Sequence, residues 1–220
     1  MRTDTAHEHW NSEWAGLAAD SKWATPEAEV LDWAMGFAPG SRVLDLGSGV
    51  GRHALALARS GHHVTALDAA SEGLAEMRRK ATAEGLTIAA LEGPMTDLPF
   101  DTDSFDHVVS WNVIYHGDES VVRASIAEIA RVLRPGGTFL GTMLSARRVP
   151  VELAKAPGRE ISRNTWVFEG EGDKIHPHYF CTARECLALF DGFEPLRLED
   201  REHEKPGSWH WHLVLERCGG

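Results

Sequence analysis

The sequence is poor in cysteine and contains no long apolar run. Its three cysteines, Cys181, Cys186 and Cys218, are odd in number and lack the paired spacing of a metal knuckle, so neither a disulfide framework nor a zinc knuckle is expected. No run of about 18 apolar residues is present, and residues 1–30 are acidic and rich in tryptophan rather than basic and then apolar. We therefore expect a soluble, cytoplasmic protein without a membrane partner.

Basic charge is also scarce. Lysine and arginine total 22 against 33 aspartates and glutamates, giving a formal charge of −11 that would repel a nucleic-acid backbone. Nucleic acid is thus not expected as a partner. One segment, residues 145–164, reverses the balance, and a solvated loop is favoured there over an anion-attracting rim. Its charged residues are Arg147, Arg148, Lys155, Arg159 and Arg163 against Glu152 and Glu160.

Strand and helix patterns alternate along most of the chain, which predicts a single α/β domain over residues 1–220. Two amphipathic helices within residues 1–40 precede the first strand and are expected to form a helical cap. Residues 145–180 show little periodicity and several prolines and glycines, so we expect an insertion that serves as a lid. Strands are expected at 43–46, 64–67, 88–91, 105–111, 138–144, 194–198 and 210–215, and helices at 53–59, 71–84, 120–133 and 182–190.

A glycine-rich motif, VLDLGSGVGR at residues 43–52, joins the first strand to a helix. Its glycines allow a ligand to approach the backbone closely. A dinucleotide fingerprint would place its third glycine at position 52, which is Arg52, and a pyrophosphate has no need of a carboxylate at Asp45. A ligand with a cationic end, such as the ammonium and sulfonium of S-adenosylmethionine, suits Asp45 and the glycine backbone better.

Asp68 ends the second predicted strand, 21 residues after Gly47. A carboxylate at this place accepts hydrogen bonds from ribose hydroxyls in nucleotide-binding βαβ units. The alternative is that Asp68 only caps the helix expected from Ser71.

The chain resembles the class I S-adenosylmethionine-dependent methyltransferases in four stretches: VLDLGSGVGR, VTALDAA, DLPFDTDSFDHVVSW and RVLRPGGTFLGT. The resemblance implies a Rossmann-like three-layer sandwich with a seven-stranded, mostly parallel sheet whose last strand is antiparallel. It also implies that cofactor and substrate bind at the carboxyl ends of the parallel strands. The cofactor-binding residues that it implies are Asp45, Gly47, Ser48, Gly49, Gly51, Arg52, Asp68, Ala69, Met95, Thr96 and Asn112.

One position departs from the family pattern. The acidic partner of the adenine amino group usually stands just before the position of Met95, where this chain has Pro94. The backbone at Met95 and Thr96, or the side chain of Asp97, is expected to take its place. The alternative for Asp97 is a loop cap.

Candidates for the substrate side follow the strand at residues 105–111, because active-site residues favour such strand ends. We expect His116, Tyr115 and His210 to act in catalysis, with histidine suited to serve as a base near neutral pH. His210 and His212 point to one face of the last strand, whose start should lie at the same edge of the sheet. A pocket shared by these histidines is favoured over a bound transition metal, and no metal is expected. The expected substrate-binding residues are Trp10, Trp14, His176, His178, Tyr179 and His212.

A weaker likeness concerns the acceptor. The stretches HPHYF, GFEPLRLE and HWHLVLER are similar to small-molecule methyltransferases related to the tellurite-resistance group, which implies a thiol, a selenol or a metalloid oxyanion. The sequence therefore predicts methyl transfer to a small molecule such as a thiol, a chalcogen or an anionic metabolite. A hydroxyl- or amine-directed methyltransferase of secondary metabolism and a catalytically silent cofactor-binding domain remain alternatives. The oligomeric state is not predicted.

Overall fold

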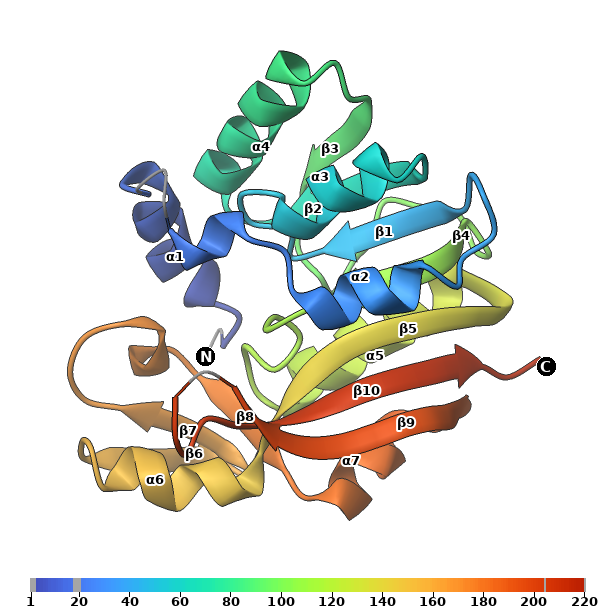
Figure 1. Cartoon of the computed structure of the whole chain (residues 1–220). Coiled ribbons are helices and arrows are strands. Elements are labelled where there is room, and N and C mark those ends of the chain that lie inside the picture. Colours follow the sequence, from blue (N-terminus) through green and yellow to red (C-terminus); the bar gives the residue numbers. More distant parts are fainter. Residues whose placement is uncertain (1–2, 18–20, 204, 220) are drawn as a thin grey trace.

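A computed structural model describes residues 3–17, 21–203 and 205–219. Its main sheet has the order β3-β2-β1-β4-β5-β10-β9 (Figure 1). β3, β2, β1, β4 and β5 run parallel, whereas β10 is antiparallel to both of its neighbours. This confirms the expected seven-stranded pattern with an antiparallel last strand. The strands are β1 (Arg42–Leu46), β2 (His63–Asp68), β3 (Ile88–Glu92), β4 (Phe105–Ser110), β5 (Leu133–Ser145), β9 (Phe193–Glu202) and β10 (Trp209–Arg217).

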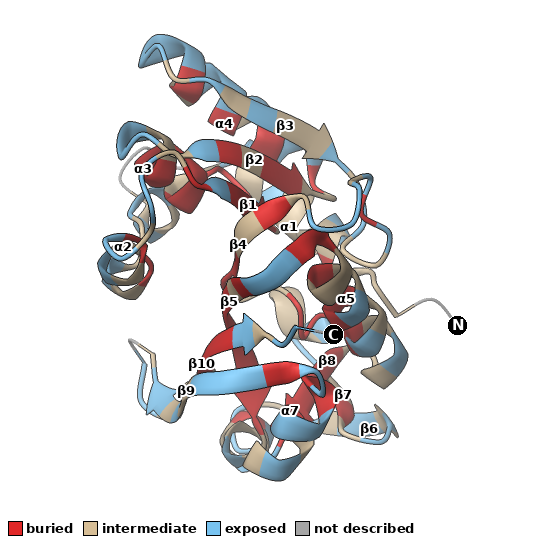
Figure 2. Ribbon diagram, turned by 90° about the vertical axis from the view of Figure 1, so that its right-hand side faces the viewer, coloured by how far each residue is buried: buried red, intermediate tan, exposed pale blue. Residues whose placement is uncertain are grey.

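Helices cover both faces of this sheet and make a three-layer sandwich. Because side chains alternate across a strand, Val43 faces one helical layer and Leu44 the other, and each belongs to a separate buried cluster. The central strands are buried on both sides, as Figure 2 shows. One layer contains α2 (Ala28–Ala34), α3 (Arg52–Arg59) and α4 (Ser71–Ala83), and the other contains α5 (Glu119–Val132) and α7 (Ala183–Leu189).

Side-chain caps fix the start of the second helical layer. The carboxylate of Asp118 accepts hydrogen bonds from the backbone N–H groups of Ser120 and Val121 and so begins α5. Thr182 and Glu185 form the predicted capping box at α7.

The predicted turn at residues 134–137 takes the form of a bulge within β5. Phe105 of β4 pairs with Leu133, and His107 pairs with Thr138, so Asp106 alone lies opposite four residues. Gly136 has a φ of +71°, which favours glycine. The proline and glycines thus bend the strand without ending it.

Residues 145–180 are more regular than the sequence predicts. They form η2 (Ala146–Arg148), α6 (Val149–Leu153), β6 (Gly158–Ser162), β7 (Thr165–Phe168), η3 (Asp173–Ile175) and β8 (His178–Cys181). β8 pairs in parallel with the end of β5, and β7 pairs antiparallel with β8 and with β6. The segment therefore adds three short strands to the sheet that the sequence did not predict, and its expected role as a lid stays a prediction.

The N-terminal segment contains α1 (Ala6–Ala15) and η1 (Lys22–Ala24), and α1 lies against α4 (Figure 1). Asn11 Oδ1 accepts a hydrogen bond from the N–H of Glu72, and Thr5 Oγ1 lies 2.9 Å from Nδ1 of His176. The segment thus bridges α4 and η3 at the edge where the parallel strands end. Residues 1–2 and 18–20 of the expected cap lie outside the described residues. Within the described ranges, no helix has the length and apolar character to cross a membrane.

Candidate functional site

Three cavities adjoin one another at the carboxyl ends of the parallel strands. We call them the β2-end cavity, beside Asp68 and Ala69, the glycine-loop cavity, beside residues 47–50, and the histidine cavity, beside His210 and His212. Trp10 lines all three. The histidine cavity measures about 490 Å³, a size that holds a small organic molecule.

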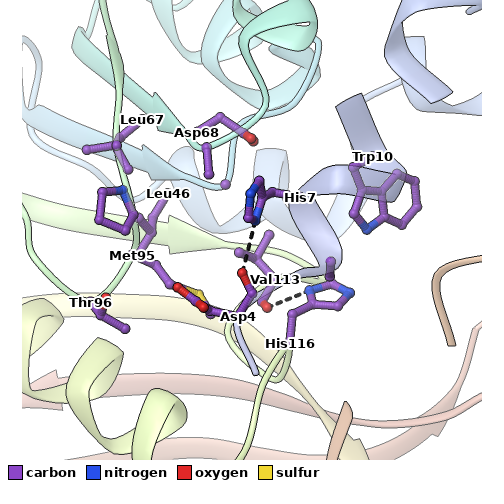
Figure 3. Close-up of a pocket in the computed structure, with 15 residues that line it drawn as sticks. Asp4, His7, Trp10, Leu46, Leu67, Asp68, Met95, Thr96, Val113 and His116 are labelled. Atoms are coloured by element: carbon purple, nitrogen blue, oxygen red, sulfur yellow. Dashed lines mark hydrogen bonds between the residues drawn. The ribbon is translucent and has the colours of Figure 1, made fainter. Parts of the chain in front are cut away.

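The β2-end cavity contains the predicted ribose and adenine residues Asp68, Ala69, Met95 and Thr96, together with Pro94. Figure 3 shows Asp68 and Met95 on one side and His7 and Trp10 of α1 on another. The apolar walls, the half-buried carboxylate and the backbone beside Met95 fit an adenosyl group without the usual acidic partner. Asp97 is exposed, and it is absent from the cavity lining in the described part of the chain.

Asp68 also shapes the glycine loop. Its Oδ2 accepts a hydrogen bond from the N–H of Gly49 and its Oδ1 from that of Ala70, both at 2.7 Å. Burial raises the pKa of Asp68, and the two backbone donors oppose that shift. Each carboxylate oxygen retains a second lone pair for a ligand hydroxyl. The N-cap residue of α4 is Ala70 and no side chain caps this helix, so the capping alternative for Asp68 is not supported, and its ligand role stays a prediction.

The glycine-loop cavity contains the predicted residues Gly47, Ser48, Gly49, Arg52 and Asn112. A Cβ on Gly47 would lie 2.4 Å from the Val113 methyl groups, so this position requires glycine. The Oγ of Ser48 is buried and has no hydrogen-bond partner within the described residues. A polar atom in this state is suited to a ligand, and the lining fits the aminoacyl end of S-adenosylmethionine.

Asp45 and Gly51 stand behind the loop rather than in it. Asp45 is 1% exposed, its Oδ2 accepts the N–H of Ala54 at 2.9 Å, and burial raises its pKa to about 7. Gly51 is the N-cap of α3 and lies against Met77. Both residues hold the start of α3, and neither lines the three cavities formed by the described chain, so their expected contact with the cofactor stays a prediction.

The lining of the histidine cavity contains more basic than acidic residues, in contrast to the protein as a whole. The chain carries a formal charge of −11, yet six lysines and arginines line this cavity against four acidic residues. Arg148 lies between Nε2 of His210, at 3.0 Å, and Oε1 of Glu152, at 2.7 Å. The six cationic residues are Lys22, Arg52, Arg148, Lys174, Arg201 and Lys205, and the four acidic residues are Glu27, Glu29, Asp173 and Glu202.

His203, His210 and His212 form a network in this cavity. The rings of His203 and His210 stack with centroids 3.7 Å apart, and Nε2 of His203 lies 2.9 Å from Nε2 of His212. Nδ1 of His212 lies 2.7 Å from Glu29 Oε2. Burial would raise the pKa of Glu29, but His212 and two arginines lower it, so the carboxylate is ionised. The network is anchored at one end by Glu29 and at the other by Arg148.

His210 is therefore not placed as a base. Its Nδ1 lies 2.8 Å from the carbonyl oxygen of Ser208 and must carry the proton, so Nε2 accepts from Arg148. Burial lowers the pKa of His210, and likewise lowers that of His203 to about 3. His210 orients Arg148 rather than taking a proton.

The expected single pocket of histidines is divided in two. His116 lines the β2-end cavity and faces His178 with ring centroids 4.7 Å apart, whereas His210 and His212 line the histidine cavity. Tyr115 lies between the groups, 4.8 Å from the His116 ring and 6.1 Å from the His210 ring, and lines the histidine cavity. Burial raises the pKa of Tyr115, so its hydroxyl stays protonated.

Three expected substrate contacts, His176, His178 and Tyr179, do not line these cavities in the described structure. His178 and Tyr179 belong to β8, where pairing with β5 and β7 buries them, and His176 is bound to Thr5. Trp14 lines only the glycine-loop cavity of the three.

Several lining residues were missed by the sequence analysis. His203 follows β9, and β9 extends four residues beyond its predicted end at Leu198, which brings it opposite the start of β10. If residues 193–217 had been interpreted as a β-hairpin, the pairing of its two strands would have placed His203 beside His210. Arg148 was noted only as part of a charged loop. The missed residues are Glu29, Trp111, Val113, Arg148, Asp173, Lys174 and His203.

A family model described as a methyltransferase domain matches residues 43–137. The chain is 34% identical over 161 residues to the uncharacterized methyltransferase YodH of Bacillus subtilis (strain 168), covering 71% of this chain and 68% of that protein. It is also 42% identical over 114 residues to the demethylmenaquinone methyltransferase of Clavibacter sepedonicus, covering 51% of this chain and 44% of that enzyme. The match thus spans less than half the length of the latter relative.

Solved structures share the fold. The PH0226 protein of Pyrococcus horikoshii OT3 superimposes with a TM-score of 0.75 at 19% identity, covering 94% of this chain and 98% of that one. The 1,6-didemethyltoxoflavin-N1-methyltransferase of Burkholderia thailandensis, solved with 1,6-didemethyltoxoflavin and S-adenosylhomocysteine, gives a TM-score of 0.72 at 20% identity, covering 97% and 87%.

Proposed function

Because the chain belongs to the S-adenosylmethionine-dependent methyltransferases, we propose that it methylates a small acceptor that carries an anionic group. The junction between two cavities carries the proposal: Trp111 and Asn112 line both the glycine-loop cavity and the histidine cavity. A donor held along the glycine loop and an acceptor in the histidine cavity would meet at the end of β4. Holding two reactants in line is the main requirement of methyl transfer.

The cofactor, when bound, supplies an electrophilic methyl group on a sulfonium. The chain supplies position and charge. Asp68 and the Ser48 hydroxyl, which has no partner within the described residues, hold the donor along the glycine loop, and Trp10 covers it. Arg148, fixed by Glu152 and His210, and Lys174 offer cations to an acidic group of the acceptor. This cationic lining in an acidic protein supports an anionic acceptor.

The histidine network supports a particular acceptor atom. Burial lowers the pKa of His203 and of His210. Both rings are therefore neutral at pH 7, and both are weak bases. A neutral hydroxyl needs a base, whereas a thiolate or selenolate attacks unaided. We therefore assign a soft, anionic atom to the acceptor.

Matched acceptors test both parts of the proposal through S-adenosylhomocysteine production. Mercaptoacetate and glycolate share a carboxylate and differ in the attacking atom, while mercaptoacetate and ethanethiol differ in the carboxylate. We expect mercaptoacetate to give the highest kcat/KM of the three. Faster turnover of glycolate would show that the attacking atom is a hydroxyl oxygen rather than sulfur. Equal rates for mercaptoacetate and ethanethiol would show that the acceptor needs no anionic group. Cofactor binding without turnover of any thiol, hydroxyl or amine would favour a silent binding domain.

A further inference from the structure

Three potential metal ligands converge beside Tyr115, outside the histidine network. They are one ring nitrogen each of His116 and His178 and one carboxylate oxygen of Asp173, and these three atoms all lie within 4.8 Å of one another. Oδ2 of Asp173 is 3.3 Å from Nε2 of His178 and 3.7 Å from Nε2 of His116. The ligands come from three separate segments: the loop after β4, η3 and β8.

Backbone carbonyls fix the tautomers of both histidines. Nδ1 of His116 lies 2.7 Å from the carbonyl oxygen of Val113, and Nδ1 of His178 lies 2.8 Å from that of His176. A carbonyl oxygen can only accept, so each Nδ1 carries a proton, and the neutral form of each ring would present its Nε2 lone pair to the cluster. Metal-ligating histidines are oriented by the same kind of outer hydrogen bond.

Lys174 is a cation in contact with the cluster, and it contacts Oδ1 of Asp173 rather than the oxygen that faces the two rings. Nε2 of His178 lies 3.3 Å from Oδ2 of Asp173, and because Nδ1 faces a carbonyl oxygen, the Nε2 lone pair of the neutral ring is turned toward the carboxylate. Nε2 of His116 is buried, with the residue 7% exposed, and has no hydrogen-bond partner in the described part of the chain. Lys174 Nζ lies 3.5 Å from Oδ1 of Asp173 and leaves Oδ2 to the two rings. Lone pairs that face one another in this way are stabilised by a cation between them.

We propose that His116, Asp173 and His178 bind one divalent transition-metal cation such as Zn²⁺. Bonds of about 2.0–2.1 Å place tetrahedral ligands roughly 3.4 Å apart. The 3.3 Å distance matches that edge, and the 3.7 Å distance needs only a small side-chain adjustment. Two imidazoles and a carboxylate suit Zn²⁺ and related ions better than Ca²⁺ or Mg²⁺.

The backbone holds the two histidines in place before any ion binds. His116 and His178 form an isolated antiparallel β-bridge. The N–H of Gly117 donates to Pro177 O, and that of Tyr179 donates to Tyr115 O, both at 2.9 Å. Little ordering is therefore needed on binding.

The position of the site suggests an open coordination position. His116 lines the β2-end cavity and Asp173 lines the histidine cavity, so the ion would lie between the two. Three protein ligands leave a fourth place for water or another small ligand, as in catalytic rather than structural zinc sites. No metal was expected from the sequence, where a pocket shared by the histidines was favoured and Asp173 was not a candidate ligand.

Metal binding tests the proposal without reference to methyl transfer. The full chain, freed of metal with a chelator, is titrated with Zn²⁺ and with Co²⁺. We expect one ion per chain by metal analysis and the visible absorption bands of low-coordinate Co²⁺. Asp173→Asn and His116→Gln should weaken Zn²⁺ binding by more than the roughly 10–100-fold that loss of an outer partner costs.

Matched variants separate this site from the other histidines. His176→Gln alters a neighbour of the cluster, and His203→Gln alters the histidine network. Both should bind Zn²⁺ as the unchanged protein does. Failure of the unchanged protein to bind one ion would overturn the proposal. So would unaltered binding in Asp173→Asn and His116→Gln, or loss of the ion in His203→Gln.

Discussion

Replacing Asp68 by asparagine tests the donor side of the site. The two oxygens of Asp68 each accept a 2.7 Å hydrogen bond from the backbone, at Gly49 and at Ala70. Asparagine keeps the shape but turns an amide N–H₂ toward one of these donors and removes the charge. Hydrogen bonds to a charged group contribute about 1.5–3 kcal/mol each. The affinity for S-adenosylhomocysteine should therefore fall by roughly 10–100-fold, since about 1.4 kcal/mol is tenfold.

Titration calorimetry with S-adenosylhomocysteine measures the change, and thermal unfolding shows whether the variant still folds. Glu92→Gln is the matched control, because Glu92 pairs with Asp68 in the sheet register but is exposed. An unchanged Kd in Asp68→Asn, or an equal loss in the control, would refute the reasoning that Asp68 shapes the donor site.

Three further predictions concern the acceptor, the glycine loop and pH. Arg148→Gln should raise KM for an anionic acceptor by about tenfold, the cost of roughly one charged contact, and leave the cofactor Kd unchanged. Arg147→Gln, at an exposed position, should leave KM unchanged. Equal KM values for the two variants would argue against the role of Arg148. Gly51→Ala should lower the free energy of unfolding in urea by about 2–4 kcal/mol, because φ is +78° and the new Cβ would lie 2.1 Å from Met77 Cγ. Gly61→Ala, at φ +86° with no atom of the described residues within 4 Å, should lose only about 1–2 kcal/mol. Burial lowers the pKa of His107 to about 4, so its contribution to stability is present above pH 6.5 and is lost as the pH falls toward 4. Replacing His107 by asparagine should flatten the pH dependence of urea unfolding in that window by about 1–2 kcal/mol, and an unaltered slope would show that the histidine titrates normally.

The elements that the sequence predicted well have strong local signals. The strand before the glycine motif and α7, with its Thr182 and Glu185 box, begin within a residue of expectation. The short strands β6, β7 and β8 were missed because their pairing partners, not their own patterns, define them. β8 is buried at all four residues, so it shows no alternation, and it forms only because β5 extends far enough to pair with it.

The residues of the candidate site divide in the same way, into those with a local sequence signal and those placed by strands far away in the chain. Asp68 and the glycines were found because a spacing fixes them on one βαβ unit. Asp173 and Arg148 come from the segment at residues 145–180, and their neighbours are decided by the added strands. His203 was missed because β9 runs beyond its predicted end. The sequence thus located the edge of the sheet where the histidines gather but not the two groups into which they divide.

Trp10 is a wall common to all three cavities. A ligand that presses this ring in one cavity changes the space offered in the next. Thermodynamic linkage makes the effect mutual: any factor by which the donor alters the affinity for the acceptor must equal the factor by which the acceptor alters the affinity for the donor. If donor and acceptor occupy these cavities as proposed, the indole would give this small chain a means of reciprocal coupling between them.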